Sequence, residues 1–310
     1  MGNSTARRSL DGGAPDGIRL SAVPRVPVLD RYPPRFVTRA IDVLHLGRPH
    51  VICAYEAGDL IVDPGPESCL DTLLGGLAQE PRALLLTHVH LDHAGAAGAL
   101  VRRDPSLTVY VHERGASHLI DPSKLLASAQ RLYGDDMQRL WGEVAPIPQE
   151  RIQVLVGGET VEGMRVIATP GHASHHVTYV SEETGEAFVG DVAGVRMPGT
   201  RYTVPPTPPP DIDVEAWLAS LDAVADEQPA ALCLTHFGRY EDVGAQIERT
   251  REALRSRAEQ ARELTAEQFA ERSEAETRAA VEPEVADALV QAAPPYQLGL
   301  GLRRYWERLA

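Results

Sequence analysis

Histidine and aspartate residues that follow short apolar segments constrain this chain more than any other feature of its sequence. The densest group is a His-x-His-x-Asp-His motif at residues 88–93, directly after the apolar segment 83–87. Three further candidates each follow a separate apolar segment that is typical of a buried strand. One edge of a sheet can therefore collect the whole set. The candidate metal ligands are His88, His90, Asp92, His93, His172, Asp191 and His236.

These residue types and their spacing predict a site for two metal ions. Imidazole and carboxylate groups suit zinc, iron or manganese, and seven of them exceed what one four-coordinate ion needs. Alternate side chains of an extended segment share a face, so His88 and His90 are placed to hold one ion. Asp92 and His93 follow where the chain should turn into a helix, close to a second position. A carboxylate such as Asp191 could bridge two ions about 3.5–4 Å apart.

The ordered motifs resemble those of the metallo-β-lactamase fold superfamily. Its signature is an early aspartate, then His-x-His-x-Asp-His, then separated His, Asp and His residues, and all five segments occur here in that order. The early aspartate is Asp63 in Leu-Ile-Val-Asp-Pro-Gly, and the similarity covers roughly residues 38–245. The resemblance implies an α/β fold, a four-layer αβ/βα sandwich with a C-terminal helical appendage. A near-repeat of Leu-Thr-His, at residues 86–88 and 234–236, fits a fold of two βα halves.

The same resemblance assigns a role to each candidate ligand. It implies that His88, His90 and His172 hold the first ion, that Asp92, His93 and His236 hold the second, and that Asp191 bridges them. Asp63 is then expected to brace the ligands from behind rather than bind metal, a role that fixes ligand orientation. His176 matches a supporting histidine of relatives, whereas His175 replaces a glycine.

The predicted function is a dinuclear hydrolase of the glyoxalase-II-like branch. A metal-bridging hydroxide would attack an ester, thioester, lactone or phosphodiester bond of a small molecule, because bound metal can lower the pKa of water from about 15.7 to about 7. Zinc is the first expectation for both ions, with iron or manganese as alternatives. Asp92 is the catalytic candidate, which would orient the hydroxide and carry a proton to the leaving group.

Two other functions remain open at this point. One is an iron-dependent oxidoreductase of the same fold, similar to persulfide dioxygenases, although these leave part of the second ligand set unused. The other is a metal-binding protein without catalytic activity. Metal analysis with an oxygen-uptake assay separates the first from a hydrolase.

The chain divides into three predicted regions. An irregular N-terminal arm covers residues 1–35, a catalytic domain 36–245, and a C-terminal helical region 246–310. The catalytic domain contains a helical insertion at 121–145 and a proline-rich loop at 194–211. Strands are predicted at 41–46, 51–56 and 60–62 at the start of this domain.

The insertion and the loop supply candidate pocket residues. The apolar residues of the insertion recur at helical spacing, so a stripe that packs on the core is the favoured interpretation. The alternative is that some of them form a wall of the substrate pocket. The proline-rich loop is expected to be stiff and extended. The candidate pocket residues are Tyr133, Trp141, His175, Arg196, Arg201 and Tyr202.

Composition excludes several classes of partner. The formal net charge of −14 disfavours binding to nucleic-acid backbones. No run approaches the ~20 apolar residues of a membrane span, and the N-terminal residues lack the apolar stretch of a secretory signal. We therefore expect a cytoplasmic protein that acts on a small molecule, with no nucleic-acid or membrane partner. The charged C-terminal helices could support a homodimer.

Overall fold

Two six-stranded β-sheets form the centre of the computed structural model, which describes residues 1–2 and 37–310. The predicted arm at 1–35 lies outside the described residues apart from its first two. The first sheet, in the order β1 to β6, contains Thr38–Asp42, Cys53–Ala57, Leu60–Val62, Ala83–Leu85, Thr108–His112 and Ile152–Leu155. The second sheet runs from β12 to β7, and its strands β7 to β12 are Thr160–Val161, Met164–Ala168, Val177–Ser181, Glu186–Gly190, Ala231–Leu234 and Gly238–Tyr240.

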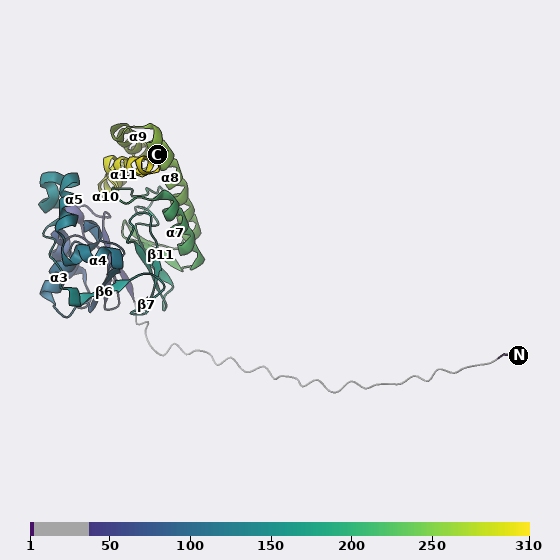
Figure 1. The fold of residues 1–310 in the computed structure, drawn as a ribbon, viewed down its shortest axis with the longest axis horizontal. Coiled ribbons are helices and arrows are strands. Elements are labelled where there is room, and N and C mark those ends of the chain that lie inside the picture. Colours follow the sequence, from purple (N-terminus) through teal and green to yellow (C-terminus); the bar gives the residue numbers. More distant parts are fainter. Residues whose placement is uncertain (3–36) are drawn as a thin grey trace. The chain divides into compact units, whose positions relative to one another are not determined.

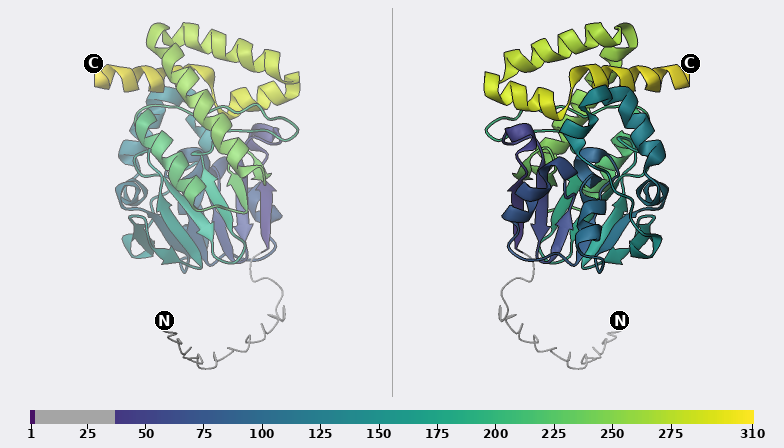
Figure 2. Two further views of the ribbon diagram at one scale, coloured as in Figure 1. Left: turned by 90° about the vertical axis from the view of Figure 1, so that its right-hand side faces the viewer. Right: turned by 90° about the vertical axis from the view of Figure 1, so that its left-hand side faces the viewer.

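Helices cover the outer faces of both sheets (Figure 1). Those of the first half, α1 to α6, are Leu70–Gly76, Leu91–Ala94, Ala97–Arg103, Glu113–Ile120, Ser123–Tyr133 and Met137–Trp141. Of these, α1 and α4 contact the first sheet, whereas α7 (Val214–Asp226) contacts the second. Because α7 and α8 lie on the opposite side from α3 and α4, the layers follow the order helix, sheet, sheet, helix (Figures 1 and 2). The predicted α/β sandwich is confirmed.

The parallel strands of each sheet bring the site segments to one edge. Strand β4 is parallel to both β3 and β5, and β10 is parallel to β11. All three residues of β4 are buried because both faces of the sheet are covered. The residues that follow β4, β10 and β11 leave their strands at the carboxyl ends, where His88, Asp191 and His236 are found.

The first predicted strand, 41–46, is wrong in its extent. Strand β1 ends at Asp42, whose carboxylate accepts hydrogen bonds from the backbone N–H groups of Leu44 (3.0 Å) and His50 (2.7 Å). Leu44 and Leu46 adopt left-handed φ angles of 53° and 55°. An aspartate that bonds backbone groups ahead of it favours a turn over a strand. The segment therefore forms a turn that places His45 in the interior.

Four helices follow the second sheet, and the last three of them lie over one end of the sandwich (Figure 2). They are α8 to α11, Val243–Glu263, Ala266–Ala280, Pro283–Ala292 and Pro295–Leu309. Proline begins both α10 and α11, where the missing N–H has no helical partner in any case. These helices belong to the same compact unit, 34–310, as the sheets.

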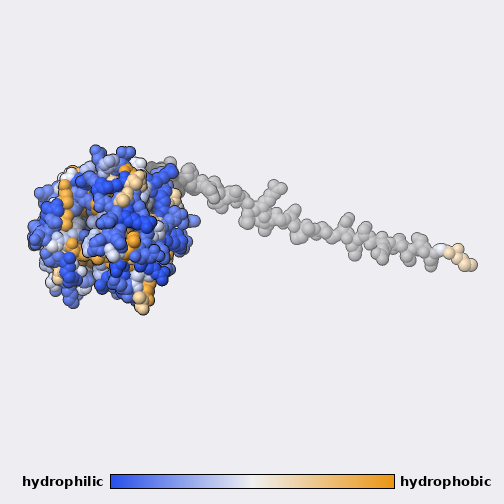
Figure 3. Space-filling view, turned by 90° about the horizontal axis from the view of Figure 1, so that it is seen from above, coloured by the Kyte–Doolittle hydropathy of each residue, from blue (hydrophilic) through white to orange (hydrophobic). Residues whose placement is uncertain are grey.

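The outer surface of the C-terminal helices is solvated, as their charged sequence predicts. Seen from this side, the molecule is mostly hydrophilic, with scattered apolar side chains (Figure 3). Exposed ion pairs such as Arg272–Glu276 and Arg278–Glu274 link successive turns of α9. None of the helices in the described part of the chain is both long and apolar enough to cross a membrane.

The inner side of these helices packs on the proline-rich loop. Gly301 of α11 lies so close to the loop that an added Cβ would stand 2.0 Å from the carbonyl oxygen of Thr207. Thr207 in turn donates from its hydroxyl to the carbonyl of Leu298 (3.1 Å), and Arg304 donates to that of Pro210 (3.2 Å). The loop is thereby fixed between the sheets and the appendage.

Candidate metal centre

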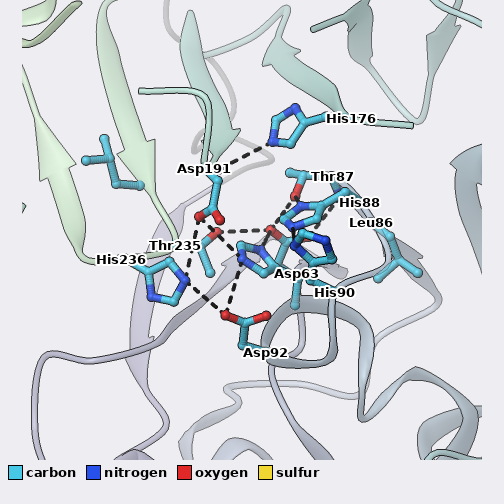
Figure 4. Close-up of polar contacts among 12 residues, drawn as sticks. Asp63, Leu86, Thr87, His88, His90, Asp92, His176, Asp191, Thr235 and His236 are labelled. Carbon is cyan, nitrogen blue, oxygen red and sulfur yellow. Dashed lines mark hydrogen bonds and ion pairs between the residues drawn. The ribbon is translucent and has the colours of Figure 1, made fainter. Parts of the chain in front are cut away.

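All seven predicted ligands lie together in the structure. Five of them, His88, His90, Asp92, Asp191 and His236, converge from the ends of separate strands and from the start of α2 in Figure 4. The ligand atoms form two groups, and within each group they lie within 4.8 Å of one another. One group is His88, His90, His172 and Asp191, and the other is Asp92, His93 and His236. This division matches the two ligand sets that the family resemblance implies.

The first group places three imidazole nitrogens around one point. His90 Nδ1 is 3.0 Å from His88 Nε2 and 2.9 Å from His172 Nε2. His172 Nε2 is also 3.1 Å from Asp191 Oδ2. Burial lowers the pKa of His90 to about 4 and that of His88 well below its usual value. Both rings are therefore neutral at pH 7, the form that binds a metal.

The second group contacts the same aspartate through its other oxygen. Asp191 Oδ1 is 3.4 Å from His93 Nε2 and 3.6 Å from His236 Nε2. Asp92 Oδ2 completes the group, 3.3 Å from His236 Nε2 and 4.0 Å from His93 Nε2. Since Oδ2 of Asp191 faces His172, its carboxylate offers one oxygen to each group. This is the arrangement that a bridging ligand requires.

Hydrogen bonds on the far side of each ring fix the nitrogens that face the cluster. His172 Nδ1 donates to the carbonyl of Pro206 (2.8 Å), and His236 Nδ1 donates to that of Val51 (2.7 Å). The Nδ1 of His88 lies 3.0 Å from the hydroxyl of Thr87. Because Nδ1 carries the proton in each ring, Nε2 keeps its lone pair toward the cluster.

Two buried atoms at the centre indicate that a cation fits between the groups. His93 Nε2 and Asp191 Oδ1 are buried and make no hydrogen bond to any described residue. A buried polar atom without a partner is costly. Burial alone would lower the pKa of His93, but the carboxylates of Asp191 and Asp63 outweigh it and raise the pKa well above its usual value. The pocket thus attracts positive charge, which a divalent ion bound to both atoms would supply.

Asp63 supports the cluster from behind and joins neither ligand group. Its carboxylate is fully buried and accepts from the backbone N–H of Thr87 (2.8 Å), from the Thr87 hydroxyl (2.7 Å), from the Thr235 hydroxyl (3.0 Å) and from His93 Nδ1 (2.7 Å). The two threonines are the middle residues of the Leu-Thr-His repeat. The repeat is visible in the sequence, but no role was predicted for its threonines.

His176 supports Asp191 in a similar way. Its Nε2 accepts from the backbone N–H of Asp191 (3.3 Å), and its Nδ1 lies 2.8 Å from the Thr169 hydroxyl. Gly190 allows this approach, because a Cβ there would stand 2.5 Å from the Thr87 hydroxyl and 2.8 Å from His176 Nε2. Gly190 also has a φ of 47°, which favours glycine.

A cavity of about 480 Å³ opens onto the cluster, and four of the seven candidate ligands line it. Its walls come from α5 and α6, from the end of the proline-rich loop and from the junction of α10 and α11. Tyr133, Trp141 and His175 line it, as expected of pocket residues. The insertion therefore walls the cavity, which was the less favoured of the two interpretations. Its apolar residues pack around Leu91, Ala129 and Trp141, apart from the main core.

The other three candidate pocket residues lie elsewhere, and their prediction is corrected. Arg196 is buried against Asp242 (2.7 Å), with its guanidinium 3.9 Å from the centre of the Tyr240 ring. The Tyr202 hydroxyl accepts from Arg257 (2.9 Å), and Arg201 is exposed. The reason is a bridge between residues 195 and 204, which turns the intervening chain away from the cavity.

Sequence reasoning missed several residues that line the cavity. His45 is buried in the turn after β1, Lys124 lies in the first turn of α5, and Gln291 lies near the end of α10. His118 also lines it. Lys124 is the single lysine of the chain. No pattern in the sequence marks His45 or Gln291 as a cavity residue.

Comparison with known proteins agrees with the geometry. A sequence profile of the Metallo-beta-lactamase superfamily matches residues 50–236. The metallo-beta-lactamase fold-containing protein ST1585 of Sulfurisphaera tokodaii is 30% identical over 162 residues, which cover 50% of this chain and 60% of that protein. A hydroxyacylglutathione hydrolase of Erwinia tasmaniensis is 34% identical over 132 residues, 43% of this chain and 41% of the relative. The matched region thus spans less than two thirds of either relative.

A solved structure shows the same fold over nearly the whole described chain. The structure of ST1585 from Sulfolobus tokodaii has a TM-score of 0.65 at 22% identity and covers 87% of this chain and 98% of that one. At this level of identity the likeness shows the fold alone. It extends beyond the region that the superfamily profile matches.

Proposed function

This chain belongs to the metallo-beta-lactamase superfamily, and we propose that it is a dinuclear metal-dependent hydrolase. Its substrate would be a small molecule with an ester, thioester, lactone or phosphodiester bond. The observation that carries the proposal is the pair of ligand groups joined by Asp191 beside a cavity. The similarity to a hydroxyacylglutathione hydrolase supports hydrolysis of an acyl bond.

The residues present suit two divalent ions. His88, His90 and His172 would hold one, the group of Asp92, His93 and His236 would hold the other, and Asp191 would contact both. Zinc is our first choice, with iron or manganese as alternatives for the same donors. When bound, such a pair lowers the pKa of a coordinated water and polarises the bond that is to be cleaved.

Asp92 has the position expected of a residue that moves a proton. Its side chain keeps 22% exposure, whereas that of Asp191 keeps 4%, and both line the cavity. Asp92 is therefore the carboxylate that a substrate can reach. We assign it the proton that passes from the attacking water to the leaving oxygen or sulfur. Oδ2 of Asp92 lies 3.3 Å from Nε2 of the neighbouring His236.

Elemental analysis and a substrate panel together test this function. The protein is purified without added metal, its metal content is measured, and ester, thioester, lactone and phosphodiester substrates are assayed before and after chelation. We expect about two ions per chain and hydrolysis that chelation abolishes and added metal restores. Full turnover with one ion per chain, or oxygen uptake without hydrolysis, would contradict the proposal and favour an iron-dependent oxidoreductase.

A further inference from the structure

The charged side chains that line the cavity favour substrates of one charge over another. Outside the seven candidate ligands, the lining residues with a formal charge at pH 7 are Lys124, Asp136 and Asp211. No arginine is among the described residues that line it. Lys124 is exposed, and Asp136 is paired with Arg139 (3.0 Å). Away from the metal cluster, the part of a substrate that carries several negative charges would meet two carboxylates, one of them already paired, and a single flexible ammonium group.

Two parts of the cavity wall contribute apolar side chains. Leu125, Leu132 and Trp141 come from the helical insertion, and Ala292, Pro294 and Leu298 come from the junction of α10 and α11. The end of the proline-rich loop joins the two parts. The volume of about 480 Å³ lies within the range of roughly 300–1,000 Å³ that is usual for small-molecule sites.

We propose that the substrate is an uncharged acyl ester or lactone whose acyl portion is an apolar chain of several carbons. This inference rests on the proposed hydrolase function and narrows it. The chain would lie between the insertion and the α10–α11 junction, with the acyl carbon at the cluster. The oxygen of water bonds to that carbon, the bond to the leaving oxygen breaks, and the leaving oxygen takes a proton. Glutathione thioesters are then poor substrates, because the carboxylates of glutathione would lie against the cavity walls rather than at the metal cluster.

Turnover of an ester series tests the apolar chain. The substrates are p-nitrophenyl esters from acetate to dodecanoate, assayed with the metal-loaded protein. Each methylene that enters an apolar site adds a roughly three- to fourfold gain, so kcat/KM should rise by that factor per carbon until the cavity is full. A flat series, or one that falls from acetate onward, would overturn the inference.

A matched pair of thioesters tests the charge. S-octanoyl-N-acetylcysteamine and S-octanoylglutathione carry the same acyl group and the same leaving atom, but glutathione adds two carboxylates and an ammonium group. We expect kcat/KM to be at least tenfold higher for the N-acetylcysteamine compound. Equal rates, or a preference for glutathione, would show that the lining charges do not select the substrate.

A pair of variants on α5 tests whether the dependence of kcat/KM on acyl-chain length arises at the cavity wall. Leu132 and Leu126 are both half-buried on this helix, but only Leu132 lines the cavity. Leu132→Ser should reduce the gain per methylene, whereas Leu126→Ser should leave it as in the wild type. The same reduction in both variants would indicate a general loss of packing and would count against the proposed wall.

Binding of methyl ketones separates this inference from the proposed function. Isothermal titration with 2-alkanones of increasing length needs no turnover, and the affinity should rise with length in the wild type but less in Leu132→Ser. If the affinity for 2-alkanones rises with chain length but no ester is hydrolysed, the proposed hydrolase function is overturned and the apolar binding site is retained. If esters are hydrolysed in a metal-dependent way but neither kcat/KM nor ketone affinity depends on chain length, the proposed hydrolase function stands and the apolar-chain inference is overturned.

Discussion

The imidazole of His45 lies parallel to the indole of Trp141, with ring centroids 5.3 Å apart and planes within 8°. His45 Nε2 donates to the carbonyl of Leu140 (3.0 Å), and its Nδ1 lies 3.3 Å from the amide nitrogen of Gln291, which also donates to the His45 carbonyl (2.9 Å). This one residue thus joins α6 to α10. Both helices wall the cavity, so the turn that carries His45 sets the distance between them.

The role of His45 leads to a prediction about pH and stability. Burial lowers the pKa of His45, and Nδ1 cannot accept from Gln291 once it is protonated. The unfolded chain takes up a proton near pH 6.5, and the folded chain does so only at lower pH. The unfolded state therefore binds more protons below about pH 6.5, and the free energy of unfolding falls as the pH falls through this range.

Urea unfolding at pH 7.5 and pH 5.5 measures this contribution. Other buried histidines also contribute to the total, so the comparison is between proteins. His45→Gln should lose less stability on acidification than the wild type, because the ionisable group is gone. His50→Gln changes an exposed imidazole of the same turn and serves as the control. If His45→Gln shows the same pH dependence as the wild type, His45 is not held neutral by the fold.

Asp63 should control metal affinity without touching the metal. Its carboxylate accepts a hydrogen bond from Nδ1 of His93 (2.7 Å) and three further hydrogen bonds. Loss of such an outer partner typically weakens metal binding by about 10–100-fold. We expect Asp63→Asn to show that loss in a calorimetric titration of metal-free protein. Thr235→Val removes a single bond to the same carboxylate and should have a smaller effect. Equal affinities in all three proteins would exclude this role.

The ligand set was predictable from sequence because it depends on local patterns. Each ligand follows a short apolar segment, and strands that are parallel end at a common edge, so the order along the chain already indicates convergence. The sandwich and the supporting role of Asp63 were expected instead from the family resemblance that these motifs carry. Asp191 was expected to bridge, but the oxygen that faces each group is seen only in the structure, since it depends on how the ends of β4, β10 and β11 face one another.

The cavity walls could be predicted only in part, because they depend on contacts between distant segments. His45 and Gln291 are 246 residues apart, and neither lies in a motif. Arg196 was expected in the pocket because it lies on the loop that follows Asp191. A single bridge between Val195 and Val204 reverses the chain and buries Arg196 against Asp242 instead. Local composition does not specify that reversal.

Removal of a ligand at the second position should abolish catalysis with loss of one ion. Asp92 contributes the accessible oxygen of its group and the proposed proton transfer, so Asp92→Ala loses both roles. Positioned acid–base groups typically contribute about 10²- to 10⁴-fold, and we expect a loss of kcat at or beyond that range. Metal analysis should show about one ion per chain. Unchanged turnover in a variant shown to lack the second ion would refute the two-ion mechanism.

The contact between α11 and the proline-rich loop gives the last prediction. Gly301→Ala would place a methyl group 2.0 Å from the Thr207 carbonyl oxygen, so the loop or the helix must move. Overpacking of this kind typically costs about 1–3 kcal/mol, more than the ~1 kcal/mol that alanine gains over glycine in a helix. The displaced loop also carries the Pro206 carbonyl that orients His172. We therefore expect a lower melting temperature together with weaker metal binding.

A second glycine separates this effect from helix propensity. Gly244 lies in α8, and an added Cβ there meets nothing within 4 Å, so Gly244→Ala should keep or raise the melting temperature. Metal affinity should be unchanged in that protein. The combined loss in Gly301→Ala would show that the C-terminal helices hold a metal ligand in place through the loop. A melting temperature that falls while metal affinity stays at the wild-type value would mean that the His172–Pro206 contact survives the displacement, and that α11 stabilises the fold without tuning the metal centre.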